Sequence, residues 1–230
     1  MNWRQKTDKW LRISVRRKLL DADLEELRRY MSGKVLEVGA GHVGRRGEFK
    51  PPFDNAESWC YINLSRAQSP DVLGDVIYPP LRGGTFDCIL CLEVLEYVRE
   101  PGRALVAMRR LLRPGGRLIL SVPFMHRMDA SNDYWRFSTH GLVMLLTQAG
   151  FLVTEKKNQG AAFAVVVNIL KYSLQVRQDR WREWRARLVR PILEAMIKRD
   201  EPLAISFATL ASFTTGSLFV AELAPIREPE

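Results

Sequence analysis

The fold is decided by Lys34-Val-Leu-Glu-Val-Gly-Ala-Gly-His-Val-Gly44, in which an apolar run from Val35 to Val38 leads into a glycine turn. An apolar run that ends in glycines is typical of a buried parallel strand followed by a tight turn. Glycine lets the backbone turn sharply at Gly39 and Gly41 and approach a ligand closely. Glu37 stands where dinucleotide-binding strands are usually apolar, and its carboxylate suits a cationic amino group. From these residues alone, a purely structural turn with an exposed glutamate stays open.

Four more segments follow this turn in a fixed order. They are Tyr61-Ile-Asn-Leu-Ser65, Asp71-Val-Leu-Gly-Asp75, Phe86-Asp-Cys-Ile-Leu-Cys-Leu-Glu-Val-Leu-Glu-Tyr97 and Leu112-Arg-Pro-Gly-Gly-Arg-Leu-Ile-Leu-Ser-Val-Pro-Phe124. In this order and spacing the chain resembles class I S-adenosylmethionine-dependent methyltransferases, specifically their bacterial type-11-like branch, from about Gly33 to Phe151. The resemblance implies an enzyme with an α/β, Rossmann-like fold. It also implies a seven-stranded, mostly parallel sheet with helices on both faces and an antiparallel last strand.

The alternation of strand and helix patterns also predicts a parallel, doubly wound sheet. Strands are expected at 35–38, 59–64, 71–73, 86–92, 117–122, 151–155 and 217–223, and helices at 21–31, 101–112 and 138–149. Pro51 and Pro52 disfavour a long helix between the first two strands. We therefore expect a short or irregular element there.

The domain organisation follows from the same pattern. Residues 1–33 are expected to form a basic N-terminal helical segment, and residues 34–230 the methyltransferase domain. A helical pattern at about 159–215 predicts an insertion before the last strand.

Charge and cysteine content bound the function. The chain has 230 residues and a formal net charge of +9, and the excess positive charge lies in residues 1–34 and 171–200. Basic flanks attract phosphate on nucleic acid or on anionic lipid, or form solvated helix faces. Three cysteines, Cys60, Cys88 and Cys91, lack metal-ligand spacing, so we expect them to be reduced and expect no metal. The charged N-terminus lacks an apolar signal segment, which predicts a cytoplasmic protein.

A basic amphipathic helix is expected at 177–198. Its apolar positions fall at helical spacing among arginines, at Trp181, Trp184, Leu188 and Ile192. This pattern is typical of a helix that lies on an anionic membrane, which predicts peripheral contact at the inner membrane face. A lid over the acceptor site remains the alternative interpretation.

The resemblance implies a set of residues that hold S-adenosylmethionine. Glu37, Gly39, Ala40 and Gly41 are expected at the methionine portion, Asn63 and Leu64 at the ribose, Asp75 and Val76 at the adenine, and Cys91 at the end of the fourth strand. Family members usually carry Asp or Glu where this chain has Asn63. Because a charged acceptor strengthens a hydrogen bond, the replacement costs about 1 kcal/mol of cofactor affinity.

The resemblance also implies acceptor-side residues after the fifth strand. Asp133-Tyr-Trp-Arg-Phe-Ser138 resembles a block that lies over the acceptor side of the cofactor in bacterial relatives. We predict catalytic roles for His126, Asp133 and Tyr134, with His126 as general base because histidine titrates near neutral pH. An exposed loop histidine is the alternative.

These expectations lead to one predicted function and two rivals. The predicted function is transfer of a methyl group from S-adenosylmethionine to a small-molecule, lipid-linked or glycan acceptor, on oxygen. The first rival is methylation of RNA or another nucleic acid, in which the basic flanks bind phosphate. The second is a non-catalytic scaffold with a degraded cofactor site, because Tyr97 and Asn63 depart from the family pattern.

Overall fold

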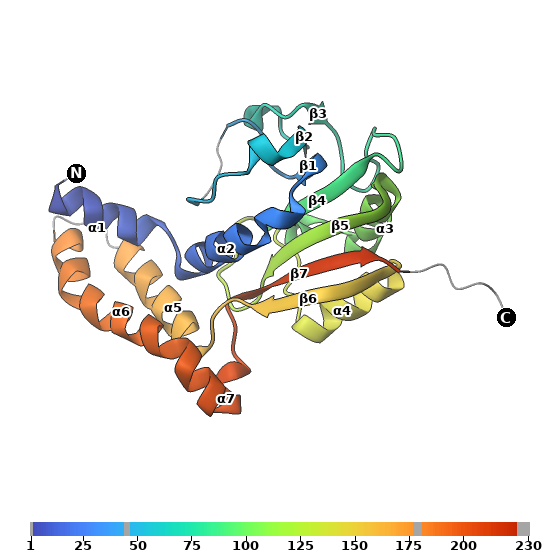
Figure 1. Ribbon diagram of the computed structural model, residues 1–230. Helices are drawn as coiled ribbons and strands as arrows, with labels where there is room; N and C mark the ends of the chain where they lie inside the picture. The colour runs from blue at the N-terminus through green and yellow to red at the C-terminus, as the bar shows by residue number, and fades with distance from the viewer. Residues whose placement is uncertain (1, 44–46, 177–180, 225–230) are drawn as a thin grey trace.

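The computed structural model describes residues 2–43, 47–176 and 181–224 (Figure 1). Its core is a seven-stranded sheet in the order β3-β2-β1-β4-β5-β7-β6. The strands are β1 (Gly33–Val38), β2 (Ala56–Asn63), β3 (Val72–Leu73), β4 (Phe86–Leu92), β5 (Leu112–Pro123), β6 (Phe151–Asn158) and β7 (Gly216–Leu223). β1 to β5 pair in parallel, and β7 runs antiparallel to both β5 and β6. The predicted fold class is confirmed.

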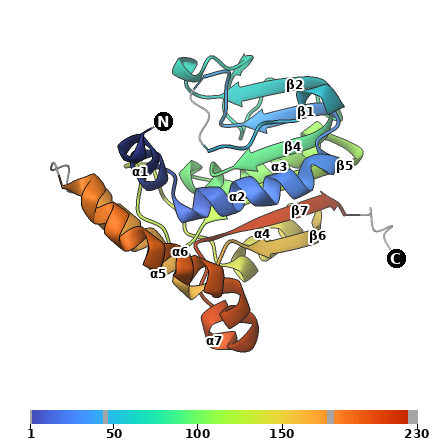
Figure 2. The ribbon, with the colours of Figure 1, turned by 60° about the vertical axis from the view of Figure 1, so that its left-hand side comes forward.

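Helices cover both faces of the sheet (Figures 1 and 2). On one face α2 (Val15–Glu26) packs its leucines against β1, β4, β5 and β7, and on the other α3 (Pro101–Leu111) and α4 (Thr139–Gln148) enclose the larger core. Side chains alternate along β1, so Val35 faces the α2 side and Leu36 the α3 side. This alternation follows from the two-residue period of a strand.

The α-helix nearest to β1 in the sequence differs from its predicted position. The sequence pattern predicts a helix at 21–31, but α2 begins at Val15 and gives way at Leu27 to the 3-10 helix η1 (Leu27–Tyr30). The reason for the early start is Ser14, whose hydroxyl accepts a hydrogen bond of 3.0 Å from the Arg17 N–H. Such a side-chain cap supplies a partner for a backbone group that has none at a helix N-terminus.

The start of β5 also differs from expectation. The sequence predicts a strand at 117–122, but β5 begins at Leu112 and includes the Pro-Gly-Gly segment at 114–116. Phe86 of β4 pairs with Leu112, while Cys88 pairs with Arg117, so five steps along β5 oppose two along β4. Proline and glycine fit such a bulge because the bulged residues do not take part in the regular ladder.

The connection from β1 to β2 is irregular, as predicted. Within its described residues, 39–43 and 47–55, the only helical element is the 3-10 helix η2 (Phe53–Asn55). Phe49, which is 5% exposed, fills the space beside α2. Arg45 and Arg46 lie outside the described residues.

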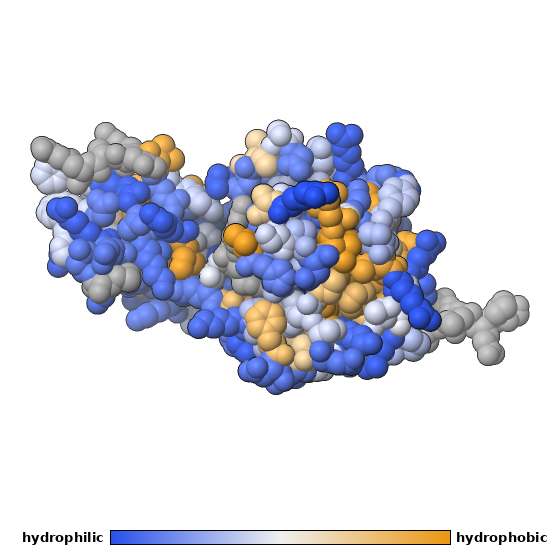
Figure 3. All heavy atoms as spheres, turned by 90° about the horizontal axis from the view of Figure 1, so that it is seen from above, coloured by the Kyte–Doolittle hydropathy of each residue, from blue (hydrophilic) through white to orange (hydrophobic). Residues whose placement is uncertain are grey.

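A helical lobe projects from the sheet (Figures 1 and 2). It contains α1 (Trp3–Arg12), α5 (Ala162–Val176), α6 (Arg182–Ser206) and α7 (Ala208–Ala211), and its buried contacts include Trp10, Leu11, Val167 and Leu193. In Figure 3 an indentation separates this lobe from the body that holds the sheet. α5 to α7 lie between β6 and β7, in the segment where a helical insertion was expected.

Candidate active site

The functional residues expected from the sequence lie at the carboxyl ends of the parallel strands. β1 ends at Val38, β2 at Asn63, β4 at Leu92 and β5 at Pro123, and all four ends meet at one edge of the sheet. Ligands of open α/β sheets bind at this edge, where the strand order reverses. Here the reversal lies between β1 and β4.

The glycine turn after β1 is set by close packing. Gly39 has a φ of 78°, and a Cβ atom there would lie 2.4 Å from a methyl group of Val94. A Cβ atom on Gly41 would lie 1.9 Å from the carbonyl oxygen of Gln68. Both positions therefore require glycine to let neighbouring segments approach, in addition to any role in ligand binding.

Glu37 is a buried carboxylate next to this turn. Glu37 is 5% exposed, and its Oε2 accepts a hydrogen bond of 3.1 Å from the Trp59 indole N–H. A buried carboxylate requires hydrogen bonds or an opposite charge to offset its lost hydration. Glu37 thus places negative charge beside the turn, at the end of a strand in the middle of the sheet.

Asn63 makes contacts that a carboxylate cannot make. Its Nδ2 donates to the carbonyl oxygens of Gly39 and Ala40, at 2.8 and 3.3 Å, and its Oδ1 accepts from the Ser65 N–H at 3.0 Å. An ionised Asp or Glu has no hydrogen to donate. The amide therefore ties the end of β2 to the glycine turn, which gives a physical reason for the departure from the family pattern.

The remaining residues of the expected cofactor set are spread across this edge. Leu64 is 72% exposed, and Asp75 accepts a hydrogen bond of 2.9 Å from the Ile77 N–H. Val76 and Cys91 are buried in the core on the α3 side. Burial raises the pKa of the Cys91 thiol, so this side chain stays protonated and apolar at neutral pH.

These residues fit a nucleoside that carries a cationic amino group. Gly39 and Leu64 are both exposed, and Leu64 offers an apolar surface for a purine or ribose. Glu37 supplies a carboxylate for an amino group, and the Asn63 amide oxygen has one lone pair left beside the turn. The donor set therefore fits S-adenosylmethionine, with a neutral amide where relatives have an acid.

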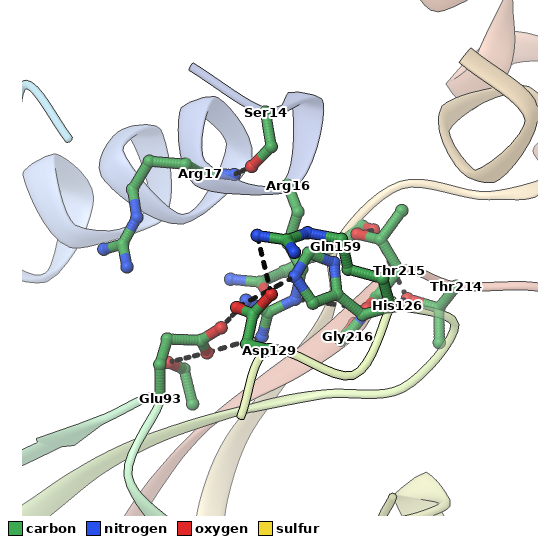
Figure 4. Close-up of polar contacts among 12 residues, drawn as sticks. Ser14, Arg16, Arg17, Glu93, His126, Asp129, Gln159, Thr214, Thr215 and Gly216 are labelled. Atoms are coloured by element: carbon green, nitrogen blue, oxygen red, sulfur yellow. Dashed lines mark hydrogen bonds and ion pairs between the residues drawn. The ribbon is translucent and has the colours of Figure 1, made fainter. Parts of the chain in front are cut away.

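A cavity of about 380 Å³ lies beside this edge, between the ends of β4 and β5 and the junction of α1 and α2. Two of the three predicted catalytic residues, His126 and Asp133, line it. Figure 4 shows His126 and Asp129 beneath Arg16, which points from α2 toward Glu93. Other lining residues are Glu96, Tyr97, Arg127 and Tyr172.

Arg16 and Glu93 form a buried ion pair at the C-terminal end of β4. The guanidinium contacts both carboxylate oxygens of Glu93, with one separation of 2.5 Å, and its Nε donates to the Thr215 carbonyl at 3.1 Å. Burial lowers the pKa of Arg16 to about 9, which leaves it charged at neutral pH. Glu93 has a left-handed φ of 59°, and Ser121 donates a hydrogen bond of 2.8 Å to its carboxylate. These contacts hold an unfavourable backbone conformation in place.

Glu96 and His126 are titratable residues of the cavity, and each has a buried atom to which no described residue forms a hydrogen bond. Glu96 is 1% exposed, and among the described residues neither its Oε2 nor the Nδ1 of His126 has a hydrogen-bond partner. Burial raises the pKa of Glu96 to about 7 and, together with Arg16, lowers that of His126 to about 4. Both groups therefore have unused hydrogen-bonding capacity, and His126 is neutral at pH 7.

Asp133 and Arg136 close the loop that carries His126. Arg136 contacts both carboxylate oxygens of Asp133, one at 2.6 Å, and donates to the Arg127 carbonyl at 3.0 Å. The hydrogen bond from Arg136 is the main cause of the lowered pKa of Asp133. Asp133 is therefore ionised, and its ion pair with Arg136 stabilises the loop that carries His126.

Tyr134 lies outside the cavity lining. Its side chain is 43% exposed, and its hydroxyl accepts a hydrogen bond of 3.2 Å from Arg99. Its N–H donates to the Glu96 carbonyl at 2.9 Å, as does that of Trp135 at 3.2 Å. The aromatic block is therefore attached through its backbone to the segment that carries Glu96.

The sequence interpretation did not identify three residues of the cavity. Glu93 and Glu96 lie in the quoted segment 86–97, where two acids spaced three apart after a buried strand are a detectable signal. Arg16 has no comparable signal, because it reaches Glu93 across 77 positions of the sequence.

Part of the sequence is similar to known methyltransferases. Residues 53–120 match a family described as "Methyltransferase domain". A ubiquinone biosynthesis O-methyltransferase from Psychrobacter cryohalolentis is 31% identical over 128 residues, which cover 49% of this chain and 50% of that protein. The chain thus matches about half the length of this curated relative.

Solved structures share the fold at low sequence identity. The [4+2]-cyclase SpnF has a TM-score of 0.57 at 18% identity, and the match covers 89% of this chain and 81% of that one. A Haemonchus contortus phosphoethanolamine N-methyltransferase in complex with S-adenosyl-L-methionine has a TM-score of 0.55 at 15% identity, over 89% of this chain and 52% of that one. Their different reactions show that the fold by itself does not determine the substrate.

Proposed function

From a methyltransferase domain on the class I S-adenosylmethionine-dependent methyltransferase fold, we propose that this chain is a methyltransferase that methylates an oxygen atom of a small-molecule, lipid-linked or glycan acceptor. One observation carries the proposal. A glycine turn with a buried carboxylate, Glu37, and a cavity with an orphaned carboxylate, Glu96, lie at the same edge of the sheet. The name of the Psychrobacter relative, an O-methyltransferase, supports oxygen as the methylated atom.

On the donor side, the chain binds and orients S-adenosylmethionine. Glu37 would hold its amino group, the backbone from Gly39 to Gly41 would face its methionine portion, Asn63 and Leu64 would meet the ribose, and Asp75 the adenine. The bound cofactor supplies a methyl group on positively charged sulfur, which is already activated for displacement. Alignment of this group with the acceptor is therefore the main task of the protein.

On the acceptor side, the chain removes a proton. A hydroxyl in the cavity donates its hydrogen bond to Glu96 Oε2, and Glu96 takes the proton as the oxygen gains the methyl group. A base is most effective when its pKa lies near the working pH, and the pKa of Glu96 is about 7. His126, with a pKa of about 4, accepts a hydrogen bond in its neutral form and is the weaker base.

The size of the cavity supports a compact acceptor group. A volume of about 380 Å³ is within the range of small-ligand sites, and it suits a small molecule or the head of a lipid-linked or glycan substrate. A cytoplasmic enzyme in peripheral contact with the inner membrane face would meet a lipid-linked acceptor directly.

Methylation of nucleic acid is less well supported by the structure. Several cations of the basic N-terminal segment are held in ion pairs within the protein, including Lys9 with Glu48 at 2.5 Å and Arg29 with Glu155 at 3.1 Å. Paired cations release fewer counterions from a phosphate backbone than free ones do.

The test of the proposed function is product identification. Metabolite, lipid and glycan extracts are incubated with the protein and S-adenosylmethionine that carries a deuterated methyl group, and products are identified by mass spectrometry. We expect one class of hydroxyl compound to gain a labelled methyl ether, and Glu96→Gln to slow its formation. Label on nitrogen or on RNA would contradict the proposed acceptor, and no labelled product in any extract would contradict methyl transfer.

A further inference from the structure

α6 presents an apolar stripe to solvent. Trp184, Leu188 and Ile192 recur at helical spacing and are 52%, 58% and 64% exposed. Ala186 and Leu193, on the other side of the same helix, are 0% and 2% exposed and pack into the core of the helical lobe. We call Trp184, Leu188 and Ile192 the α6 stripe. It is apolar surface that the fold itself does not use.

The helix beneath the stripe is firmly held. Asp200 near its C-terminal end accepts hydrogen bonds from the N–H groups of Ala161 and Phe163, at 2.6 and 2.8 Å, and so caps the start of α5. Arg182 at its start forms an ion pair of 2.5 Å with Asp8 of α1. The stripe is thus displayed on a long, anchored helix, and it lies in the lobe that projects from the sheet (Figures 1 and 2).

The charged residues of α6 are also distributed unevenly around the helix. Glu194 is held by Arg190 at 2.7 Å, and Asp200 faces the backbone of α5. Exposed cations on the helix are Arg187, Lys198 and Arg199. Glu201 is also exposed, but its position in the sequence places it on the opposite side of the helix from Ile192. The surface next to the stripe is therefore positive.

We propose that the α6 stripe and the cations Arg187, Lys198 and Arg199 form a docking surface for anionic phospholipid. Apolar side chains of an amphipathic helix enter the boundary between headgroups and acyl chains, while Arg and Lys extend to lipid phosphates. The Arg187 guanidinium lies over the Trp3 ring, 5.2 Å from its centroid, so a cation and an exposed aromatic ring lie together on this surface.

The proposed binding mode is in the plane of the membrane. No helix within the described residues is long and apolar enough to span a bilayer. Trp181, 53% exposed at the start of α6, adds an aromatic residue of the kind enriched at membrane interfaces. Arg177 and Arg180, which belong to the predicted basic helix at 177–198, lie outside the described residues. The proposed surface is therefore defined by α6 itself. The membrane proposal does not depend on methyl transfer.

The test is vesicle flotation of the whole chain. Vesicles of phosphatidylcholine alone are compared with vesicles that also contain phosphatidylglycerol. We expect binding only to the anionic vesicles, with a loss of about tenfold or more in the apolar variant Trp184→Ser/Leu188→Ser/Ile192→Ser and in the charge variant Arg187→Gln/Lys198→Gln/Arg199→Gln.

A matched control is Val106→Ser/Met144→Ser, which removes exposed apolar side chains from α3 and α4 on the sheet body. It should bind as well as the wild type. Circular dichroism and thermal unfolding check that all variants are folded. Absence of wild-type flotation, or equal flotation of the apolar variant, would overturn the proposal. A wild-type dimer that dissociates in the apolar variant, without flotation, would instead assign the stripe to a second copy of the chain.

Discussion

Arg16 of α2 reaches the end of β4 and holds Glu93 in a buried ion pair, with Arg16 3% and the Glu93 side chain 16% exposed. The pair connects the N-terminal helices to the edge of the sheet that carries the site. Arg16→Met leaves the Glu93 charge buried and unpaired, so we expect the free energy of unfolding to fall by about 3–5 kcal/mol. Urea denaturation measures this change. The double variant Arg16→Met/Glu93→Gln should recover most of it, and a loss below about 1 kcal/mol in the single variant would contradict this role for the pair.

The glycine turn gives a second prediction. In Gly39→Ala, alanine would have to adopt a left-handed backbone with a φ of 78°. Its methyl group would also lie 2.4 Å from a methyl group of Val94. We expect a loss of about 1–3 kcal/mol in stability. Gly102→Ala in α3 is the matched control, because its Cβ would meet nothing within 4 Å and alanine favours a helix. Thermal unfolding of both variants should shift in opposite directions, and equal shifts would count against the turn geometry.

Asn63 gives a third prediction. Asn63→Asp restores the family residue but removes the donor to the Gly39 and Ala40 carbonyls and places a negative charge beside them. Stability should fall by about 0.5–1.5 kcal/mol, since two partly solvated carbonyls lose their partner. Asn55→Asp in the exposed η2 provides the control for an added charge. Urea melts that show the same loss for both variants would refute the proposed role of the amide.

The pH dependence of methyl transfer distinguishes Glu96 from His126. If Glu96 is the base, the rate rises with pH through an apparent pKa of about 7 as the carboxyl loses its proton. If His126 is the base, the rise lies near pH 4 and the rate is flat at neutral pH. We expect the first profile in the wild type and its loss in Glu96→Gln, with His126→Gln retaining it.

Stability should change with pH in the opposite sense for Glu96. Its folded pKa of about 7 lies above the ordinary value of 4.5, so the folded state binds the proton more tightly, and stability is lost as pH rises from about 4.5 to 7. The folded pKa of His126 lies below its ordinary 6.5, so this residue lowers stability as pH falls from about 6.5 to 4. Urea melts of Glu96→Gln across this range should lack the first loss.

The sheet could be predicted from the sequence because its signals are local. The apolar run Val35 to Val38 and the glycines after it determine β1 and its turn, and β4 matches its expected bounds. Starts of elements were less predictable: α2 begins six residues early because of the Ser14 cap, and β5 absorbs the Pro-Gly-Gly segment as a bulge.

The cavity could be predicted only in part. His126 and Asp133 follow from the resemblance, but Glu93, Glu96 and Arg16 come together through tertiary contacts. The ion pair of Arg16 with Glu93 depends on how α2 packs across the sheet, which no local pattern specifies. The same holds for the hydrogen bond from the Asn63 amide to the Gly39 carbonyl, which joins residues of two different strand ends.

Isothermal titration calorimetry with S-adenosylmethionine tests the central claim most directly, because it needs no acceptor. We predict saturable binding to the wild type and affinity at least about tenfold weaker in Glu37→Gln, in which the amide can still accept the Trp59 hydrogen bond but carries no charge. Unchanged thermal unfolding of the variant would confirm that the fold is intact. No heat at millimolar cofactor, or equal affinity in Glu37→Gln, would contradict the account.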